Sequence, residues 1–225
     1  MTRLDYLKLD KYFFADPASG KSRLKKVRAR QAIMGVAVDW LHRIFVIYAW
    51  AGRIPTSSFK QRIIDVYEKF QPRLFGIEAN AMQELFGDLV RDEAKRKFGT
   101  VRIVPVQQPT KIEKEFRIRT TVEPVMFDGR LFVASSERDD ESRPIGVDAM
   151  TNELLAEISG FPTAATKDMV DALASAISLI PRRLVKKREK EEFETLAEYL
   201  RHSGLPGYMI EQRLDEVRRD AGIGR

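Results

Sequence analysis

The 225-residue chain contains no cysteine and only two histidines, His42 and His202. Without cysteine there can be no disulfide, no thiolate zinc site and no cysteine nucleophile. A Ser-His-Asp triad or a histidine-rich metal site would depend on one of two histidines that lie far apart in the sequence, and neither has a suggestive context. The absence of cysteine suits a reducing compartment.

Long apolar runs are also missing. No segment approaches the ~18 consecutive apolar residues of a transmembrane helix, and the N-terminus lacks a signal-peptide pattern. Hydrophobic residues make up 44% of the chain and charged residues 32%, enough for one core and a well-solvated surface. We therefore expect a soluble, intracellular protein with one domain of ordinary size and a small appendage.

Acidic residues are fewer than basic ones, 33 against 39, which gives a formal net charge of +6. The excess is concentrated in two runs. Residues 21–30 carry six bases and no acid, and residues 182–190 carry six bases and one acid. Such runs are most often solvated faces, but two of them in a basic chain favour a polyanionic partner.

Strand-forming composition recurs through the first half of the chain, at residues 11–16, 31–40, 43–52, 73–78 and 101–106. The short connection between the second and third of these segments predicts a hairpin. The mostly apolar fourth segment is typical of a strand buried on both faces. An Asp-Gly pair later in the chain predicts a turn that leads into one more short strand.

Apolar residues between these strands recur at the three- and four-residue steps of helices. The first helix follows Ser57 and Ser58, which can cap it. The second opens at the cap pair Asn80 and Gln83. Its predicted apolar positions are Met82, Leu85, Phe86 and Leu89. Further helices are predicted at 110–122, 151–159 and 167–180, with an acidic loop at 135–147.

This order of elements predicts an α/β fold with a mixed β-sheet flanked by helices. We expect residues 1–181 to form the core. From residue 182 the chain changes to a basic run, an amphipathic helix through Phe193 and Leu200, and a last helix after a Gly-Leu-Pro-Gly break. Residues 182–225 are therefore predicted to be a basic, helical C-terminal appendage.

The stretch from Ala15 to Ser22 fits a relaxed phosphate-loop pattern, which makes an ATP-binding motor fragment one interpretation. In a phosphate loop, the Lys and Ser open a helix that docks on the sheet through an apolar stripe. Here only Leu24 and Val27 could form that stripe, and Pro17 removes one amide from the loop. Loss of nucleotide affinity in Lys21→Ala would distinguish this alternative.

The same stretch places a carboxylate, Asp16, at the end of an apolar strand. Glu78 ends another apolar strand, and Asp168 and Asp171 lie near the start of an apolar helix, on one narrow polar stripe of it. Singly, these are a turn former, a strand end and first-turn acids favoured by the helix dipole. Jointly, acids at the ends of three separate buried elements indicate a metal site.

Four stretches resemble one known family, the nuclease domain of tailed-bacteriophage terminase large subunits, within the ribonuclease-H-like superfamily. They are "YFFADPASGKS", "PRLFGIEANAMQ", "PTKIEKEFRIRTTVEPVMFDGRLFVA" and "FPTAATKDMVDALASAISLI", and the resemblance covers about residues 10–181. The resemblance implies a ribonuclease-H-like fold and a divalent-metal-dependent endonuclease. In the family, one acid closes the first strand, a second follows the fourth strand, and a third comes from the terminal helix.

The resemblance thus implies Asp16, Glu78 and Asp168 as catalytic residues and metal ligands, with Asp171 as a rival or additional ligand. The family commonly has His-Asp-Asp where this chain has Thr166-Lys167-Asp168. This departure leaves open the second metal's ligands and the group that carries protons. Carboxylates prefer hard cations, so two Mg²⁺ or Mn²⁺ ions are expected, with Asp16 as the bridging ligand.

Basic residues near the predicted site are expected to contact DNA phosphates, which would make binding sequence-independent and salt-sensitive. The run beside Asp16 supplies most of them, and the family-like run "TKIEKEFRI" supplies the others. They are Lys21, Arg23, Lys25, Lys26, Arg28, Arg30, Lys111, Lys114 and Arg117.

The implied role is to cut concatemeric, double-stranded viral DNA during packaging, in the host cytoplasm at the procapsid. The implied partners are DNA, a terminase ATPase domain, a small terminase subunit and a portal protein, with no membrane. No motor domain fits before residue 11, so we expect an excised nuclease domain or a motor on a separate polypeptide. The alternatives are a junction resolvase or transposase-type nuclease, and a DNA-binding module without catalysis.

Overall fold

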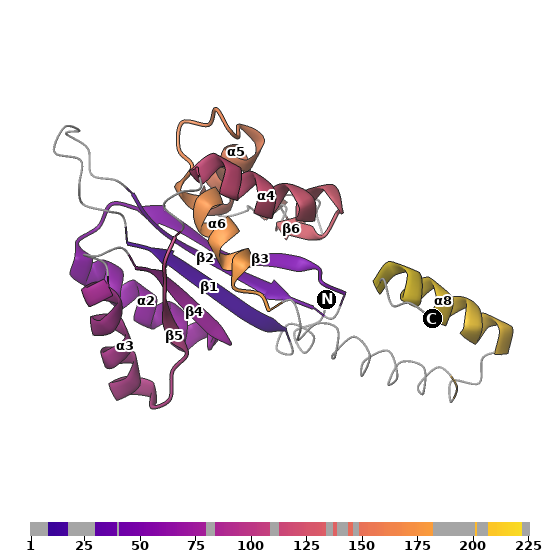
Figure 1. Ribbon diagram of the computed structural model, residues 1–225, viewed down its shortest axis with the longest axis horizontal. Coiled ribbons are helices and arrows are strands. Elements are labelled where there is room, and N and C mark those ends of the chain that lie inside the picture. Colours follow the sequence, from indigo (N-terminus) through magenta and orange to yellow (C-terminus); the bar gives the residue numbers. More distant parts are fainter. Residues whose placement is uncertain are drawn as a thin grey trace. The chain divides into compact units, whose positions relative to one another are not determined.

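The computed structural model describes residues 9–17, 30–39, 41–79, 84–108, 113–133, 137–138, 144–145, 149–181, 201 and 207–221. Its main feature is a six-stranded sheet with the order β5-β4-β1-β2-β3-β6 (Figure 1). The strands are β1 (Asp10–Asp16), β2 (Gln31–Val38), β3 (Ile44–Gly52), β4 (Leu74–Glu78), β5 (Ile103–Val106) and β6 (Leu131–Val133).

The sheet is mixed. β4 pairs in parallel with both β1 and β5, and β3 pairs in parallel with β6. β2 and β3 are neighbours joined by only five residues, so they form an antiparallel hairpin. Asp39 organises the turn, because its Oδ1 accepts hydrogen bonds from the Leu41 and Arg43 amides at 3.0 and 2.9 Å. The predicted hairpin is confirmed.

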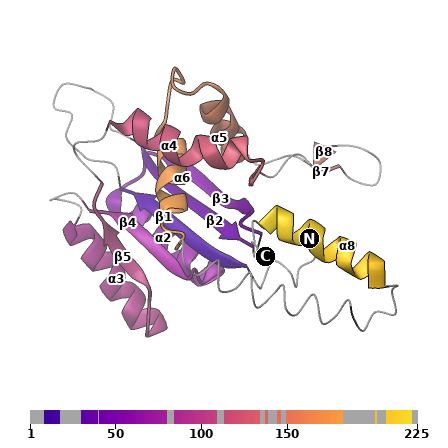
Figure 2. The ribbon, with the colours of Figure 1, turned by 45° about the vertical axis from the view of Figure 1, so that its right-hand side comes forward.

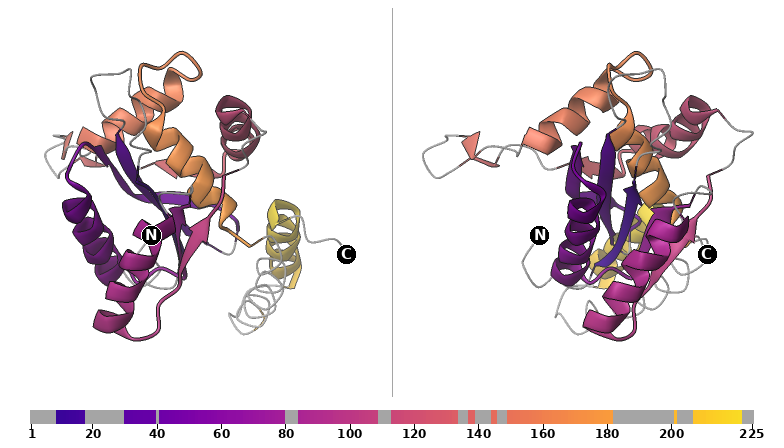
Figure 3. Two further views of the ribbon diagram at one scale, coloured as in Figure 1. Left: turned by 60° about the vertical axis from the view of Figure 1, so that its left-hand side comes forward. Right: turned by 90° about the vertical axis from the view of Figure 1, so that its left-hand side faces the viewer.

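Helices cover both faces of the sheet (Figure 3). One face carries α2 (Thr56–Phe70) and α3 (Glu84–Phe98). The other carries α4 (Lys114–Phe127), α5 (Ala149–Ser159) and α6 (Asp168–Ser178). This three-layer arrangement confirms the predicted α/β fold with a mixed β-sheet flanked by helices.

A continuous apolar core lies between the sheet and the α2–α3 layer. Phe13 of β1 is at its centre, fully buried, with its ring 5.0 Å from Phe70 and 5.7 Å from Phe75. Alternate residues of β1 and β4 point into this core, as the two-residue period of a strand requires. The residues between them therefore face α6, which packs directly against β1.

Some predicted helix details are wrong. α2 begins at Thr56 after Pro55, and no side chain caps it, so Ser57 and Ser58 lie inside its first turn. Leu85 and Leu89 of α3 are 70% and 55% exposed. The buried stripe of α3 consists instead of residues four apart, Phe86, Val90 and Ala94. The predicted cap pair Asn80 and Gln83, and Met82, lie outside the described residues.

Two further predicted boundaries differ from the structure. The helix expected at 110–122 begins at Lys114 and continues through Pro124 to Phe127, where the predicted turn follows at Gly129. The stretch expected as a loop at 135–147 contains two short antiparallel strands, β7 (Glu137–Arg138) and β8 (Pro144–Ile145) (Figure 2). Backbone pairing of two residues leaves no pattern that periodicity could detect.

Contacts divide the chain into two compact units. One comprises residues 1–37 and 44–180, and the other comprises residues 38–43 and 181–225. Within the second unit, α8 (Gly207–Ala221) buries Ile210 and Leu214. That residues 182–225 are a separate appendage stays a prediction, and the helix expected through Phe193 lies outside the described residues. No helix in the described ranges is long and apolar enough to cross a membrane.

Candidate functional site

Asp16 and Glu78 end two neighbouring parallel strands at the same edge of the sheet. The register pairs Ala15 with Ile77, so Asp16 and Glu78 are the next partners, with Cα atoms about 4.8 Å apart. Ala15 and Ile77 belong to the core beneath α2 and α3. Because side chains alternate along a strand, both partly buried carboxylates point to the opposite face, which α6 covers.

The other two acids stand on the first turn of α6. Asp168 is the first residue of the helix, and Asp171 follows one turn later. The Asp168 side chain is 26% exposed, whereas that of Asp171 is 10% exposed. Apolar residues on the remaining surface of α6 pack it against β1, β3, α4 and α5. The helix therefore holds both acids at a fixed height above the sheet.

A buried glutamate of α5 fixes the start of α6. Glu157 is 2% exposed, and its Oε2 accepts hydrogen bonds from the Met169 and Val170 amides at 2.9 and 3.0 Å. Lys167 stands at the N-cap position without a side-chain cap bond. Glu157 thus satisfies amides that a helix N-terminus leaves unpaired, and its charge suits the helix dipole.

Arg30 completes this support. Its Nη1 lies 2.5 Å from Glu153 Oε1 and 4.0 Å from Glu157 Oε1, and the residue is 9% exposed. A buried, ion-paired guanidinium serves packing between the start of β2 and α5. Sequence reasoning placed Arg30 with the DNA-contacting bases and did not identify Glu157. A carboxylate that caps another helix leaves no local sequence signal.

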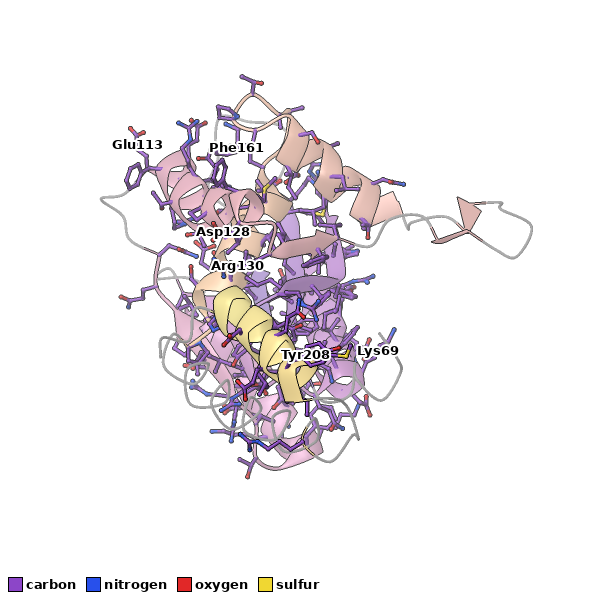
Figure 4. All side chains as sticks on the ribbon, turned by 90° about the vertical axis from the view of Figure 1, so that its right-hand side faces the viewer. Lys69, Glu113, Asp128, Arg130, Phe161 and Tyr208 are labelled. Atoms are coloured by element: carbon purple, nitrogen blue, oxygen red, sulfur yellow. The ribbon has the colours of Figure 1, made fainter. Side chains whose placement is uncertain are left out.

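Two cations of α4 meet the acids of α6. Lys114 Nζ lies 3.1 Å from Asp171 Oδ2 and 4.0 Å from Asp168 Oδ1. Arg117 Nη2 donates to Asp171 Oδ1. Figure 4 shows Glu113, which precedes Lys114, and Asp128 at opposite ends of α4, so both cations lie on its first turns.

Three nearby acids affect the pKa of Lys114. Burial lowers it, but the charge and hydrogen bond of Asp171, and then the charges of Asp168 and Asp16, outweigh burial and raise the pKa above its ordinary value. Asp16 of β1 and the two acids of α6 therefore share one electrostatic environment around Lys114.

A polar contact also links β5 to α6. Gln108, two residues beyond β5, donates from Nε2 to Ser175 Oγ at 2.8 Å, and Ser175 Oγ donates to the Asp171 carbonyl oxygen at 3.0 Å. Ser175 is buried on the polar stripe that Asp168 and Asp171 begin. Gln108 was not among the predicted site residues, because a single glutamine after a strand carries no distinctive pattern.

The predicted DNA contacts, Arg30 included, stay predictions. Lys21, Arg23, Lys25, Lys26, Arg28 and Lys111 lie outside the described residues. In the structure, Lys114 and Arg117 contact Asp171.

The donors present fit a hard divalent cation, since all four acids offer carboxylate oxygen and three of them already act together on a cation. Within the described ranges, no three His, Asp or Glu side chains converge closely enough to hold a metal ion. In this conformation Lys114 lies beside Asp168 and Asp171, and Arg117 adds a second positive charge at Asp171.

No protein-family model and no curated protein matches the chain. Among solved structures, it is similar to a large terminase nuclease from thermophilic phage G20c, with 13% identity, a TM-score of 0.43 and coverage of 77% of this chain and 84% of that one. It is also similar to Thermus thermophilus RuvC in complex with a Holliday junction substrate, with 10% identity, a TM-score of 0.39 and coverage of 76% and 91%. A second T. thermophilus RuvC structure gives 13% identity and a TM-score of 0.38, and covers 78% and 95%. TM-scores below 0.5 do not assign the chain to either family or to an activity.

Proposed function

We propose that this protein is a divalent-metal-dependent endonuclease that hydrolyses phosphodiester bonds of double-stranded DNA. Asp16, Glu78 and Asp168 are its catalytic carboxylates, and Asp171 is an additional ligand. The observation that carries the proposal is the register of β1 and β4, which pairs Ala15 with Ile77 and so puts Asp16 and Glu78 at the ends of adjacent strands. α6, whose first turn carries Asp168 and Asp171, packs against β1. The shared influence of Asp16, Asp168 and Asp171 on Lys114 supports it.

The acids would bind Mg²⁺ or Mn²⁺, two ions in the active complex, with Asp16 central between Glu78 and the acids of α6. Bound divalent ions supply the charge that polarises a phosphodiester and lowers the pKa of water. The chain's own contribution is positional. The strand pair sets the spacing of two carboxylates, and Glu157 holds the start of α6.

The proposed biological role is the nuclease step of viral genome packaging, in the host cytoplasm at the procapsid. Its proposed partners are a terminase ATPase domain, a small terminase subunit and a portal protein. This role rests on the family-like stretches of the sequence, and the basic run at 21–30 suits contact with DNA phosphates.

A plasmid-nicking assay tests the proposal. Supercoiled plasmid is incubated with Mn²⁺ and the wild type, Asp16→Asn, Glu78→Gln, Asp168→Asn or Asp171→Asn. Loss of an outer-shell partner of a metal costs about 10- to 100-fold, so loss of a direct ligand should slow cleavage at least about 100-fold. Asp65→Asn makes the same chemical change on the exposed surface of α2 and should cut normally.

The outcomes separate the alternatives. Normal cutting by Asp16→Asn, Glu78→Gln and Asp168→Asn would reject the site. DNA binding without cleavage by the wild type would indicate a binding module. A parallel incubation with a synthetic four-way junction distinguishes a junction resolvase, which would cut the junction in preference to linear duplex of the same sequence.

A further inference from the structure

The Lys114 ammonium lies where a divalent cation would neutralise the acids of α6. Its Nζ is 3.1 Å from Asp171 Oδ2 and 4.0 Å from Asp168 Oδ1, so it approaches both acids of the first helical turn. An ammonium donates hydrogen bonds and coordinates nothing, so Lys114 occupies one lone pair of Asp171 Oδ2 and brings a positive charge to the place where a metal ion would bring its own.

Charge extends this competition beyond the direct contacts. Asp16, on the end of β1, also stabilises the charged form of Lys114, although it belongs to a different element. Three of the four proposed ligands therefore favour one monovalent cation from the chain itself. A divalent ion entering this site adds to the positive charge of Lys114 and is repelled by it at short range.

Lys114 and Arg117 contact the same carboxylate but differ in their freedom to leave it. The Arg117 side chain is 17% exposed and that of Lys114 is 43% exposed. Lysine also has a flexible four-carbon stem and a single donor group, whereas the guanidinium of arginine is planar and presents a rigid fork. Lys114 can rotate into solvent without unpacking α4, while Arg117 keeps α4 attached to α6.

We propose that Lys114 is a built-in competitor for the divalent ions of this site. In the metal-free protein its ammonium pairs with Asp168 and Asp171, and it is displaced from them when a divalent ion binds. This inference rests on the proposed function, because it presupposes that these acids are metal ligands. The displaced ammonium then faces the incoming phosphates, in line with the DNA contact predicted for Lys114.

Calorimetric titration of the full-length protein with Mn²⁺, and separately with Ca²⁺, tests this proposal without DNA. The informative variants are Lys114→Met, which keeps most of the stem and removes the charge, and Lys114→Arg, which keeps the charge. The matched control is Arg119→Met. Arg119 lies on the same helix and is exposed, and its Nε is 3.1 Å from Glu123 rather than near the acids of α6.

Lys114→Met should bind Mn²⁺ roughly two- to fivefold more tightly than the wild type, the range expected from losing a partly exposed ion pair. Lys114→Arg should bind like the wild type or more weakly, and Arg119→Met should stay within about twofold of the wild type. A thermal-shift series gives a second readout. Lys114→Met should gain more thermal stability on Mn²⁺ addition than the wild type does, because tighter binding to the native state stabilises it more.

Two results together would overturn the competition and leave the proposed metal site standing. Lys114→Met would bind Mn²⁺ no more tightly than the wild type, and Asp16→Asn would abolish the binding seen in the wild type. Absence of Mn²⁺ binding in the wild type and in every Lys114 variant would overturn both. Far-ultraviolet circular dichroism of each variant confirms that a change in affinity is not a loss of fold.

Discussion

At the scale of single residues, two glycines show that a buried strand position and an open helix position differ in whether they tolerate an added methyl group. A Cβ built on Gly35 of β2 would lie 2.3 Å from the ring of Phe13. Phe13 is fully buried and is flanked by Phe70 and Phe75, so its ring cannot move aside. Gly35 is therefore required by packing, with no need for an unusual backbone angle.

We expect Gly35→Ala to lower the free energy of unfolding by about 1–3 kcal/mol, the usual cost of overpacking a core. Gly87→Ala is the matched control. Gly87 lies in α3, and its added Cβ would have only Ile77 Cγ2 near it, at 4.0 Å. There alanine should raise the free energy of unfolding by about 0.5–1 kcal/mol. Urea denaturation measures both, and equal effects of the two substitutions would contradict the packing argument.

Single residues also mark the limit of prediction from sequence. Asp16, Glu78 and Asp168 could be singled out because each stands at the end or the start of an apolar segment. Their relation to Lys114, Arg117 and Glu157 could not, because these contacts join elements that are distant in the sequence. A charge on a surface-like helix has the same sequence pattern whether it meets solvent or a buried carboxylate.

At the scale of elements, α6 depends on a cap that another helix supplies. Replacing Glu157 by alanine removes the acceptor of the Met169 and Val170 amides and leaves Arg30 with one fewer carboxylate. We expect a loss of about 1–3 kcal/mol in the free energy of unfolding, the cost of buried groups left unpaired. Hydrogen exchange of these two amides should accelerate more than that of amides in α3. Unchanged exchange would show that Glu157 does not hold the helix start.

The pair Lys60 and Glu93 ties α2 to α3 and should make their association depend on pH. The hydrogen bond from Lys60 is the largest influence on the pKa of Glu93 and lowers it. Burial, the next largest, raises the pKa, but together with the charges of Lys60, Arg96 and Lys97 the hydrogen bond keeps it below its ordinary value. A carboxyl group whose pKa is lowered by folding stabilises the native state at pH values above its ordinary pKa. This stabilisation is lost as the pH falls through the lowered pKa.

The difference in unfolding free energy between the wild type and Lys60→Met should therefore shrink as the pH is lowered from neutral to about pH 3. Lys95→Met removes the same charge from an exposed position on α3 and should show a smaller, flatter difference. Urea denaturation across this pH range checks both variants. A difference that grows on acidification would contradict the assigned direction.

Most elements could be predicted because their periodicity is strong, as in β1 and α6. The exceptions have physical causes. α3 exposes Leu85 and Leu89 because the sheet contacts the stripe four residues apart that begins at Phe86. α2 starts after Pro55, whose carbonyl oxygen accepts the Phe59 amide at 2.9 Å as the first bond of the helix, so Ser57 and Ser58 lie within the first turn and not at the cap position. Local propensity cannot show which stripe a tertiary neighbour will cover.

At the scale of the whole molecule, the formal charge of +6 and its uneven placement should govern DNA affinity. Binding to linear duplex in EDTA should weaken steeply with salt, as counterion release requires. Lys25→Ala, in the basic run, should reduce the slope of log affinity against log salt by about 1. Arg30→Ala should leave that slope unchanged but lower stability, because Arg30 is buried against Glu153.

Fluorescence anisotropy at several salt concentrations measures these slopes, and Lys95→Ala on α3 controls for a general loss of charge. A slope change in Arg30→Ala as large as that in Lys25→Ala would contradict the structural role of Arg30. Equal slopes in all variants would instead remove the basic run from the DNA-contacting surface.

The α/β architecture could be predicted from the order of strands and helices, because hairpins and crossover helices restrict how a sheet is assembled. The pairing of Asp16 with Glu78 could not be predicted from the order of elements alone. It follows from the register between β1 and β4, in which a shift by one residue would turn one carboxylate into the core. No local pattern determines register across sixty residues of intervening chain.

The proposed metal ligands stand on β1, β4 and α6, whereas the two cations that contact Asp171 both stand on α4. The elements that position the carboxylates and the helix that supplies the neighbouring positive charges are therefore different parts of the chain. Replacing Lys114 alone would change the charge beside the proposed ligands, while the strands and the helix that space the carboxylates keep their packing. If the proposed function holds, the affinity for ions can therefore change without a change in the spacing of the carboxylates.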